Sequence, residues 1–199
     1  MVKINKIYTR TGDAGSSGLV DGSRLSKGDA LFDAIGDVDE ANGVLGLVRA
    51  ALCAEKSPIE AALDQRLSVI QNDLFDLGAD LATPPRDGDA PFAPGEMELR
   101  IIASQVTRLE GEVDAMNATL SPLRSFILPA GGEVVARLHL ARSVVRRAER
   151  SAVKTAATRA LNPAALSYIN RLSDWLFVAA RHIAQQHGGD VLWVPGASR

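Results

Sequence analysis

Apolar residues recur along most of this chain at spacings of three and four positions, which is the period of one face of an α-helix. Five runs follow this spacing, and they extend from Leu31 to Leu52, Ile59 to Leu81, Ile102 to Met116, Val134 to Ala152 and Leu166 to Ile183. Each run predicts a helix of about 20 to 27 residues, or roughly 30–40 Å. Long helices of matched length with short links pack side by side in alternating directions. We therefore predict an all-α fold, a five-helix antiparallel bundle with an up-and-down arrangement.

Start and turn signals between the runs indicate a single domain. Ser57-Pro58 and Asn162-Pro163 are typical of helix starts, and the stretch 83–95 holds four prolines and two glycines, which predicts a loop. No internal repeat and no linker divides the chain into two cores. We expect one domain over residues 1–199, with an irregular segment at 1–28, the helical bundle at 29–187 and a tail at 188–199.

The composition is that of a globular protein without a strong charge bias. Of 199 residues, 46% are hydrophobic, which is enough to bury a full core. The net charge of -2 gives no general attraction to nucleic acid or anionic lipid. No stretch approaches the roughly 18 apolar residues that span a bilayer, and the first eight residues lack the apolar core of a signal peptide. We expect a cytoplasmic protein with neither a nucleic-acid nor a membrane partner.

Neither the cysteine nor the histidines predict a metal site. Cys53 is the only cysteine, which excludes an internal disulfide and a cysteine cluster, and we expect it to be a small buried apolar residue. His139, His182 and His187 do not have the spacing of metal ligands. For His139 we expect a buried, hydrogen-bonding role.

Chemistry-bearing residues concentrate in the fourth predicted helix. His139, Arg142, Arg146 and Glu149 are spaced three, four and three apart, so they share one stripe beside the apolar face. Arg147 and Arg150 add two more guanidinium groups within the next turn. One interpretation is a solvated basic face. The other is recognition of phosphate or carboxylate, for which repeated arginine supplies a planar, bidentate geometry that lysine lacks.

The segment from Tyr8 to Leu19 is rich in glycine, hydroxyl and acidic residues and precedes the first helix. Backbone N–H groups in a glycine-rich turn can accept anionic oxygens, and threonine and serine hydroxyls add donors. The Walker A spacing is absent. The segment is therefore either a phosphate-binding loop of another kind or a flexible terminus. Lys27, just before the first helix, is either an added charge for polyphosphate or an ordinary exposed lysine.

Six linked motifs carry a resemblance to a known family. They read KIYTRTGDAGSSGL followed by RLSKGD, then IGDVDEANGVLG, FILPAGG, LHLARSVVRRAER and LNPAALSYINRLSDWLFVAAR. In this order and separation the chain resembles the PduO-type ATP:cob(I)alamin adenosyltransferases over nearly its whole length. The resemblance implies a ferritin-like five-helix bundle that assembles as a homotrimer, with active sites between neighbouring subunits.

The resemblance also implies a reaction, in which the 5′-deoxyadenosyl group of ATP passes to the cobalt of cob(I)alamin and gives adenosylcobalamin and tripolyphosphate. The residues it assigns to ATP binding are Thr9, Arg10, Thr11, Gly12, Ser17, Gly18, Lys27, Arg146, Arg147, Ala148, Glu149, Arg150 and Asn170. Arg142, Arg146 and Asp39 are the implied catalytic residues, with an ion pair between Arg142 and Asp39 across two helices. Phe126 is implied to face the cobalamin cobalt in place of its lower axial ligand. Mg²⁺ is expected through the ATP phosphates rather than through protein ligands.

The chain departs from the family pattern at a few positions. Ala14 stands where lysine is frequent, Ser16 and Ser17 where threonine is frequent, and Ala130 where glycine is usual. Loss of the lysine weakens phosphate affinity slightly in this interpretation, and Ala130 is unfavourable if its position requires a positive φ.

Two other classes of function remain open from the sequence. One is a carrier or sensor that binds ATP or adenosylcobalamin without turnover, and the other is a structural bundle whose arginines pair with a neighbouring subunit. With one cysteine and no flavin motif, the enzyme interpretation needs an external reductase to make Co(I). An adenosylcobalamin-dependent acceptor enzyme is a further expected partner. The sequence leaves open whether the tail becomes ordered only when corrin binds.

Overall fold

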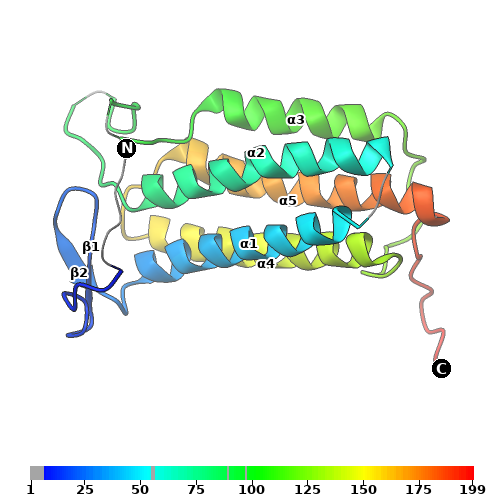
Figure 1. Ribbon diagram of the computed structural model, residues 1–199, viewed down its shortest axis with the longest axis horizontal. Coiled ribbons are helices and arrows are strands. Elements are labelled where there is room, and N and C mark those ends of the chain that lie inside the picture. The colour runs from blue at the N-terminus through cyan, green and yellow to red at the C-terminus, as the bar shows by residue number, and fades with distance from the viewer. Residues whose placement is uncertain (1–6, 55–56, 89, 97) are drawn as a thin grey trace.

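The computed structural model describes residues 7–54, 57–88, 90–96 and 98–199, and five α-helices make up most of them. The helices are α1 (Ala30–Leu52), α2 (Pro58–Leu81), α3 (Ala103–Asn117), α4 (Glu133–Ala156) and α5 (Pro163–Ala184), followed by the short 3-10 helix η1 (Gln185–His187). Successive helices run in opposite directions along one long axis (Figure 1). The predicted five-helix antiparallel bundle is confirmed. The length expected for the third helix is wrong, because α3 spans only 15 residues.

The apolar faces meet in one continuous core. α1 packs against α2 and α4, α5 packs against α4 and α3, and the large buried side chains include Leu45, Leu67, Leu138 and Leu176. Full burial of such a side chain stabilises the fold by about 1.5–3 kcal/mol. Among the described residues, no helix is long and apolar enough to cross a membrane.

Side-chain caps fix where the helices begin. Ser57 caps α2 in a capping box with Glu60, and Asn162 caps α5 by accepting from the Ala164 N–H. A cap of this kind is worth about 0.5–2 kcal/mol. Cys53, the residue directly after α1, is exposed, so the predicted buried role for it is wrong.

A buried carboxylate holds the ends of three helices together. Asp80, near the end of α2, accepts hydrogen bonds from Arg100 Nη1 at 2.8 Å, from the Ile101 N–H at 2.8 Å and from Asn162 Nδ2 at 2.7 Å. The side chains of Asp80 and Arg100 are 1% and 0% exposed. This cluster fixes the loop after α2 and the start of α5 in one arrangement.

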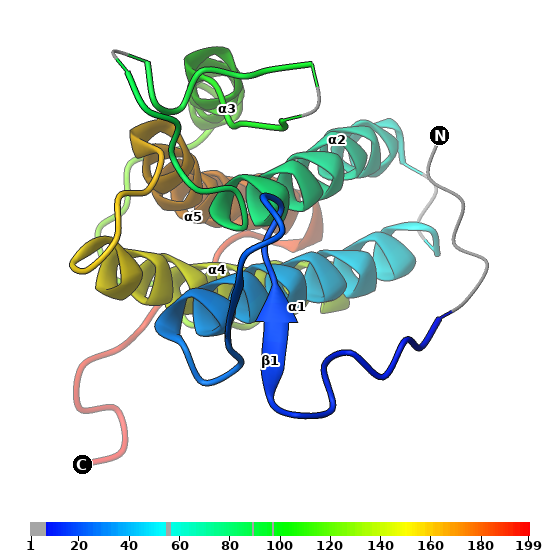
Figure 2. The same ribbon diagram turned by 90° about the vertical axis from the view of Figure 1, so that its left-hand side faces the viewer.

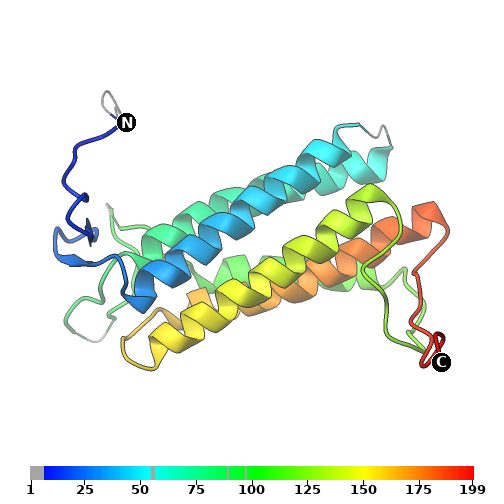
Figure 3. The same ribbon diagram turned by 90° about the horizontal axis from the view of Figure 1, so that it is seen from below.

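The N-terminal segment, residues 7–28, is called the strap from here on. It contains a small antiparallel hairpin of β1 (Ser16–Gly18) and β2 (Arg24–Ser26), paired with Ser17 opposite Leu25. The hairpin stands at the end of the bundle where α1 begins (Figure 2). The tail, residues 188–199, lies at the opposite end (Figures 1 and 3). For the strap, the sequence predicted an irregular segment and missed the hairpin.

Candidate functional site

A pocket of about 440 Å³ opens beside the C-terminal half of α4, and we call it the guanidinium pocket. Its lining residues are Arg146, Glu149, Arg150, Val153 and Asn170. Asn170 of α5 donates from Nδ2 to Glu149 Oε1 at 2.8 Å, which joins the two helices across the pocket. Helices α4 and α5 therefore bring together four of the residues assigned to ATP from the sequence.

The arginines of α4 divide into paired and unpaired groups. Arg137 is ion-paired with Glu133 of the same helix, and Arg147 with Asp37 and Glu40 of α1. Among the described residues, Arg142, Arg146 and Arg150 form no ion pair with a carboxylate. Burial and the nearby positive charge of Arg146 lower the pKa of Arg142. The unpaired guanidinium groups leave a concentration of positive charge that an anion would neutralise.

The strap is a compact loop built on turns and an arginine tether. Thr11 donates its hydroxyl to Thr9, and the Gly15 N–H bonds to the Gly12 carbonyl at 3.1 Å. Arg24 reaches back to the Thr11 carbonyl and to both side-chain and backbone oxygens of Ser16, at 3.0 Å in each case. The glycine-rich segment is therefore held in one shape rather than being a loose terminus.

Two features of the strap favour an anion. A Cβ placed on Gly12 would lie 3.1 Å from Lys27 Nζ, so the ammonium group lies directly over the turn. Arg10 has φ 62°, a left-handed conformation that costs a non-glycine residue about 1–3 kcal/mol and is concentrated at functional sites. The remaining predicted strap residues, Thr9, Ser17 and Gly18, lie on the same loop and hairpin.

The strap does not reach the guanidinium pocket of its own chain. Among the described residues, none between 7 and 28 lines that pocket. The strap is instead attached to α2, where the Val20 N–H donates to the Ala82 carbonyl at 3.0 Å. The two halves of the expected ATP site are thus present but separated within one chain.

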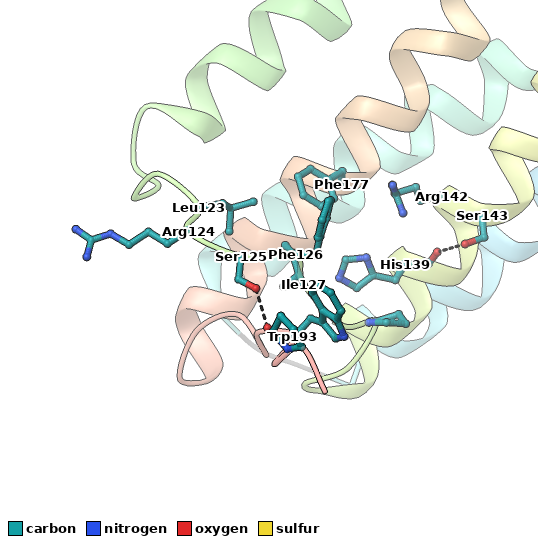
Figure 4. A pocket seen from close by; sticks show the side chains of 12 residues that line it. Leu123, Arg124, Ser125, Phe126, Ile127, His139, Arg142, Ser143, Phe177 and Trp193 are labelled. Atoms are coloured by element: carbon teal, nitrogen blue, oxygen red, sulfur yellow. Dashed lines mark hydrogen bonds between the residues drawn. The ribbon is translucent and has the colours of Figure 1, made fainter. Parts of the chain in front are cut away.

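A second pocket, of about 740 Å³, lies at the tail end of the bundle, and we call it the aromatic pocket. Phe126, Phe177 and Trp193 line it together with His139 and Arg142 of α4 (Figure 4). Arg142 lies over the Phe177 ring, with 5.3 Å between the guanidinium carbon and the ring centroid. Because Arg142 and Arg146 are one helical turn apart, the aromatic and guanidinium pockets are neighbours along α4.

Phe126 is unusually accessible for a large apolar residue. Its side chain is 78% exposed, on the irregular connection before α4. Ala130, in the same connection, does not have a positive φ; Gly131 does, with φ 119°. The departure at position 130 is therefore compatible with the backbone.

His139 is buried beside Phe126 and Arg142, and its ring makes an edge contact with Phe177 at 6.4 Å between centroids. Burial, followed by the charge of Arg142, lowers the pKa of His139, while Asp190 acts in the opposite direction. The imidazole is therefore neutral at neutral pH. Its burial is as expected from the sequence, whereas the described residues provide no side-chain hydrogen bond to its ring.

Three of the sequence-based assignments stay predictions, and the structure shows the surroundings of these residues within one chain. Among the described residues, no ion pair joins Arg142 to Asp39, because Asp39 lines a different pocket between α1 and α2. Arg147 points to α1 and not into the guanidinium pocket. Ala148 is only 1% exposed, so its side chain packs in the core and it can offer a ligand nothing but its backbone.

Two residues with a clear structural role were missed from the sequence. Arg24 holds the strap together, and Trp193 contacts Phe126 at 6.0 Å between ring centroids. Arg24 lies in the quoted motif RLSKGD, so the signal was present but was attributed to Lys27 alone. For Trp193 the only signal was an aromatic residue within the short apolar run of residues 191–195 in the tail.

Among the residues that the structure describes, no protein-only metal site accompanies these pockets. Within the described ranges, no group of three or more histidine, cysteine, aspartate or glutamate side chains has the geometry to hold a metal ion. The guanidinium pocket contains one carboxylate, Glu149, which is hydrogen-bonded to Asn170. A divalent cation here would need oxygen ligands from a bound anion and water.

Comparisons with known proteins show which family the sequence and the fold resemble. Residues 7–183 match the family model described as cobalamin adenosyltransferase. A corrinoid adenosyltransferase of Mycobacterium tuberculosis is 47% identical over 200 residues, covering 100% of this chain and 97% of that relative. A corrinoid adenosyltransferase of Bacillus subtilis is 38% identical over 187 residues, covering 94% and 91%.

A solved structure extends the match to three dimensions. A variant of the PduO-type ATP:corrinoid adenosyltransferase from Lactobacillus reuteri, complexed with cobalamin and ATP, superposes with a TM-score of 0.80. It is 33% identical in sequence, and the match covers 94% of this chain and 99% of that one. Since sequence and fold agree over nearly the full length, the chain belongs to the cobalamin adenosyltransferase family.

Proposed function

We propose that this protein transfers the 5′-deoxyadenosyl group of ATP to the cobalt of cob(I)alamin, forming adenosylcobalamin and tripolyphosphate. The observation that carries the proposal is the set of unpaired guanidinium groups on α4, next to a large aromatic pocket. Arg146 and Arg150 bind the nucleotide phosphates, and Asn170 with Glu149 holds the nucleoside. Arg142 lines the aromatic pocket one helical turn from Arg146 of the guanidinium pocket, and we assign it to the charge that develops as triphosphate leaves.

The reaction needs positioning and electrostatics more than proton transfer. Cob(I)alamin is itself the nucleophile, and triphosphate is a leaving group that arginine, lysine and Mg²⁺ stabilise. In-line placement of two bound reactants can lower a barrier by about 7–11 kcal/mol. This accounts for a site rich in arginine and with one neutral histidine. No group in it is required as a general base.

The aromatic pocket fits the corrin substrate. Its volume of about 740 Å³ and its apolar walls suit a large flat ligand. We assign Phe126 to the face of the cobalt from which the lower axial ligand is displaced, which makes reduction to Co(I) easier. The electrons come from an external reductase, and the product passes to an adenosylcobalamin-dependent acceptor enzyme.

We place the complete active site between two copies of the chain, in a homotrimer. The strap and the guanidinium pocket do not meet within one chain, and the strap is exposed at the end of the bundle where α4 ends. In a ring of copies, the strap of one chain covers the guanidinium pocket of the next. Thr9, Arg10, Thr11, Gly12, Ser17, Gly18 and Lys27 then enclose the triphosphate, with Mg²⁺ held by phosphate oxygens. Asp39 has Arg142 of a neighbouring copy as its partner in this arrangement.

The direct test is product formation. Purified protein is incubated with MgATP and chemically reduced cobalamin, while the corrinoid spectrum and released tripolyphosphate are measured. The proposal requires both adenosylcobalamin and tripolyphosphate in equal amounts. Binding of ATP and corrinoid without either product would identify a carrier, and absence of ATP binding would identify a structural bundle. The cytoplasmic location we propose is tested separately by fractionating cells.

A further inference from the structure

The tail is fixed to the bundle through one buried ion pair. Asp190 accepts from Arg181 Nε at 3.0 Å, and the two side chains are 10% and 7% exposed. Arg181 also donates to the Ser121 carbonyl at 2.8 Å, which ties the connection before α4 to the same point. Gly188 and Gly189 both have left-handed φ values, 97° and 96°, and they turn the chain from η1 into the tail.

Beyond this anchor the tail pairs with the segment that carries Phe126. The Leu128 N–H donates to the Val191 carbonyl and the Trp193 N–H to the Phe126 carbonyl, each at 2.8 Å. Ile127 and Leu192 form an antiparallel bridge, and Ser125 Oγ donates to the Trp193 carbonyl at 2.7 Å. The tail thus forms a short added strand along the edge of the aromatic pocket (Figure 4).

The pairing brings two exposed aromatic rings together. The Phe126 and Trp193 centroids are 6.0 Å apart with an interplanar angle of 59°, a favourable tilted arrangement. Phe126 is 78% exposed and Trp193 is 42% exposed. An isolated phenylalanine on an irregular connection samples several rotamers. The contact with Trp193 limits those rotamers.

We propose that Trp193 is a positioning residue that holds the Phe126 ring in the orientation used against the corrin. The role rests on the proposed function, in which Phe126 occupies the axial face of cobalt. Trp193 acts through Phe126, and the backbone pairing of the tail places it there. The tail then forms an ordered part of the lining of the corrin site.

The first test uses the protein without ligands and is independent of the proposed function. The chain has two tryptophans, and Trp175 is 0% exposed and hydrogen-bonded to Glu112 through its indole N–H. Changes in emission at the red edge of the tryptophan spectrum therefore report Trp193. We expect Phe126→Ala to shift that emission and to increase its quenching by acrylamide by about two- to threefold, because the indole loses its aromatic neighbour. Unchanged emission and quenching would overturn the contact.

The second test measures the coordination of cobalt. With MgATP and cob(II)alamin bound, the four-coordinate fraction is determined by electron paramagnetic resonance. We expect Trp193→Ala to lower the ratio of four- to five-coordinate cobalt by about two- to tenfold, the range for losing an aromatic pair, and Trp193→Phe to restore most of it. Val194→Ala, an exposed neighbour in the tail, is the matched control and is expected to leave the ratio unchanged.

The outcomes separate the two proposals. If wild-type protein binds no corrinoid, the proposed function fails, and so does the positioning role. If wild-type protein gives four-coordinate cobalt and Trp193→Ala gives the same ratio, the positioning role alone is overturned. Thermal unfolding of each variant shows whether the bundle is intact; should Trp193→Ala not fold, Trp193→Leu takes its place with the same expected loss.

Discussion

At the scale of single residues, the arginines of α4 show how the same side chain serves two purposes. Arg137 and Arg147 are neutralised by carboxylates and hold elements together. Arg142 and Arg146, on the intervening turns, have no such carboxylate among the described residues. The division follows from which face of the helix each residue occupies. Substitution of a paired arginine is therefore expected to affect the fold, whereas substitution of an unpaired arginine is expected to affect ligand binding.

Arg146→Ala is expected to weaken ATP binding by about 10- to 100-fold, because a charge-assisted hydrogen bond to an anion is worth about 1.5–3 kcal/mol. Arg146→Lys keeps the charge but loses the bidentate geometry, so an intermediate loss is expected. The measurement is isothermal titration with MgATP. Arg137→Ala removes a guanidinium from the same helix outside both pockets and is the control. Equal affinities for the Arg146→Ala and Arg137→Ala variants would rule out Arg146 as a phosphate ligand.

His139 is expected to make the fold weaker in mild acid. Its folded-state pKa lies below the ordinary value of 6.5, because burial and the Arg142 charge disfavour the imidazolium. The unfolded chain therefore takes up the proton first, and the free energy of unfolding falls as pH drops below 6.5. Above that pH the contribution is constant. The pKa of His182 is lowered as well, by burial and by Arg66, so both residues act in the same direction.

Urea unfolding of wild type and His139→Phe between about pH 7.5 and about pH 5.5 measures this effect. The variant is expected to lose less stability on acidification, with the remaining loss attributable to His182 and to carboxylates. His182→Gln is the comparison that isolates the second histidine. Parallel stability curves for wild type and His139→Phe would show that the buried imidazole does not titrate in this range.

Residue environments were the least predictable from the sequence. The stripe of His139, Arg142, Arg146 and Glu149 was read from helical spacing, because spacing alone decides which side chains share a face. The ion pair expected between Arg142 and Asp39 is not formed among the described residues of one chain, and Cys53 was expected to be buried although it is exposed. The environment of Arg142 depends on how the helices are placed against each other, and that of Cys53 depends on where α1 ends. A local sequence pattern contains neither kind of information.

At the scale of elements, the helices were predictable and the short pairings were not. The periodic runs gave α1, α2, α4 and α5 nearly to their ends, since proline and cap residues mark the starts. The hairpin of the strap and the pairing of the tail with Ser125–Leu128 have only a few residues each. Neither has the alternating apolar pattern of a half-buried strand. Side chains such as Arg24 and Asp190 hold these pairings through hydrogen bonds and ion pairs that no hydrophobic pattern reveals.

The buried contacts of Asp80 with Arg100, Ile101 and Asn162 join three elements, so their loss should lower the stability of the whole bundle. Asp80→Ala leaves Arg100 buried without a counter-charge and removes the acceptor of Asn162 Nδ2. The expected loss in the free energy of unfolding is about 3–5 kcal/mol. The exposed pair on α4 is the control, because Glu133→Ala should cost about 0–1 kcal/mol. Chemical unfolding of both variants provides the measurement, and a similar small loss in each would mean that the buried cluster contributes little.

At the scale of the whole molecule, the two groups of residues expected to bind ATP lie apart within one chain. The strap lies at one end of the bundle and is attached to the end of α2, whereas the guanidinium pocket opens between α4 and α5. Because Arg24 holds the strap compact, the strap is too short to extend around the bundle to the guanidinium pocket of its own chain. The division between chains was implied by the family resemblance and was not contained in the helix pattern. What the structure adds is the separation of the two halves within one chain.

Subunit complementation tests that division. Gly12→Val brings a side chain against Lys27 and the Ser16 carbonyl and disrupts the strap, while Arg146→Ala disables the pocket. Each variant alone is expected to have little activity at an ATP concentration that just saturates the wild type, because its affinity for ATP is lower. When the two are co-expressed in equal amounts and assemble at random, about one quarter of the sites combine an intact strap with an intact pocket from the neighbouring chain. Adenosylcobalamin formation by the purified mixed assemblies, with their size checked by light scattering, should therefore recover to about a quarter of wild type. If strap and pocket of the same chain formed the site, every site would keep one defective half and no activity would return.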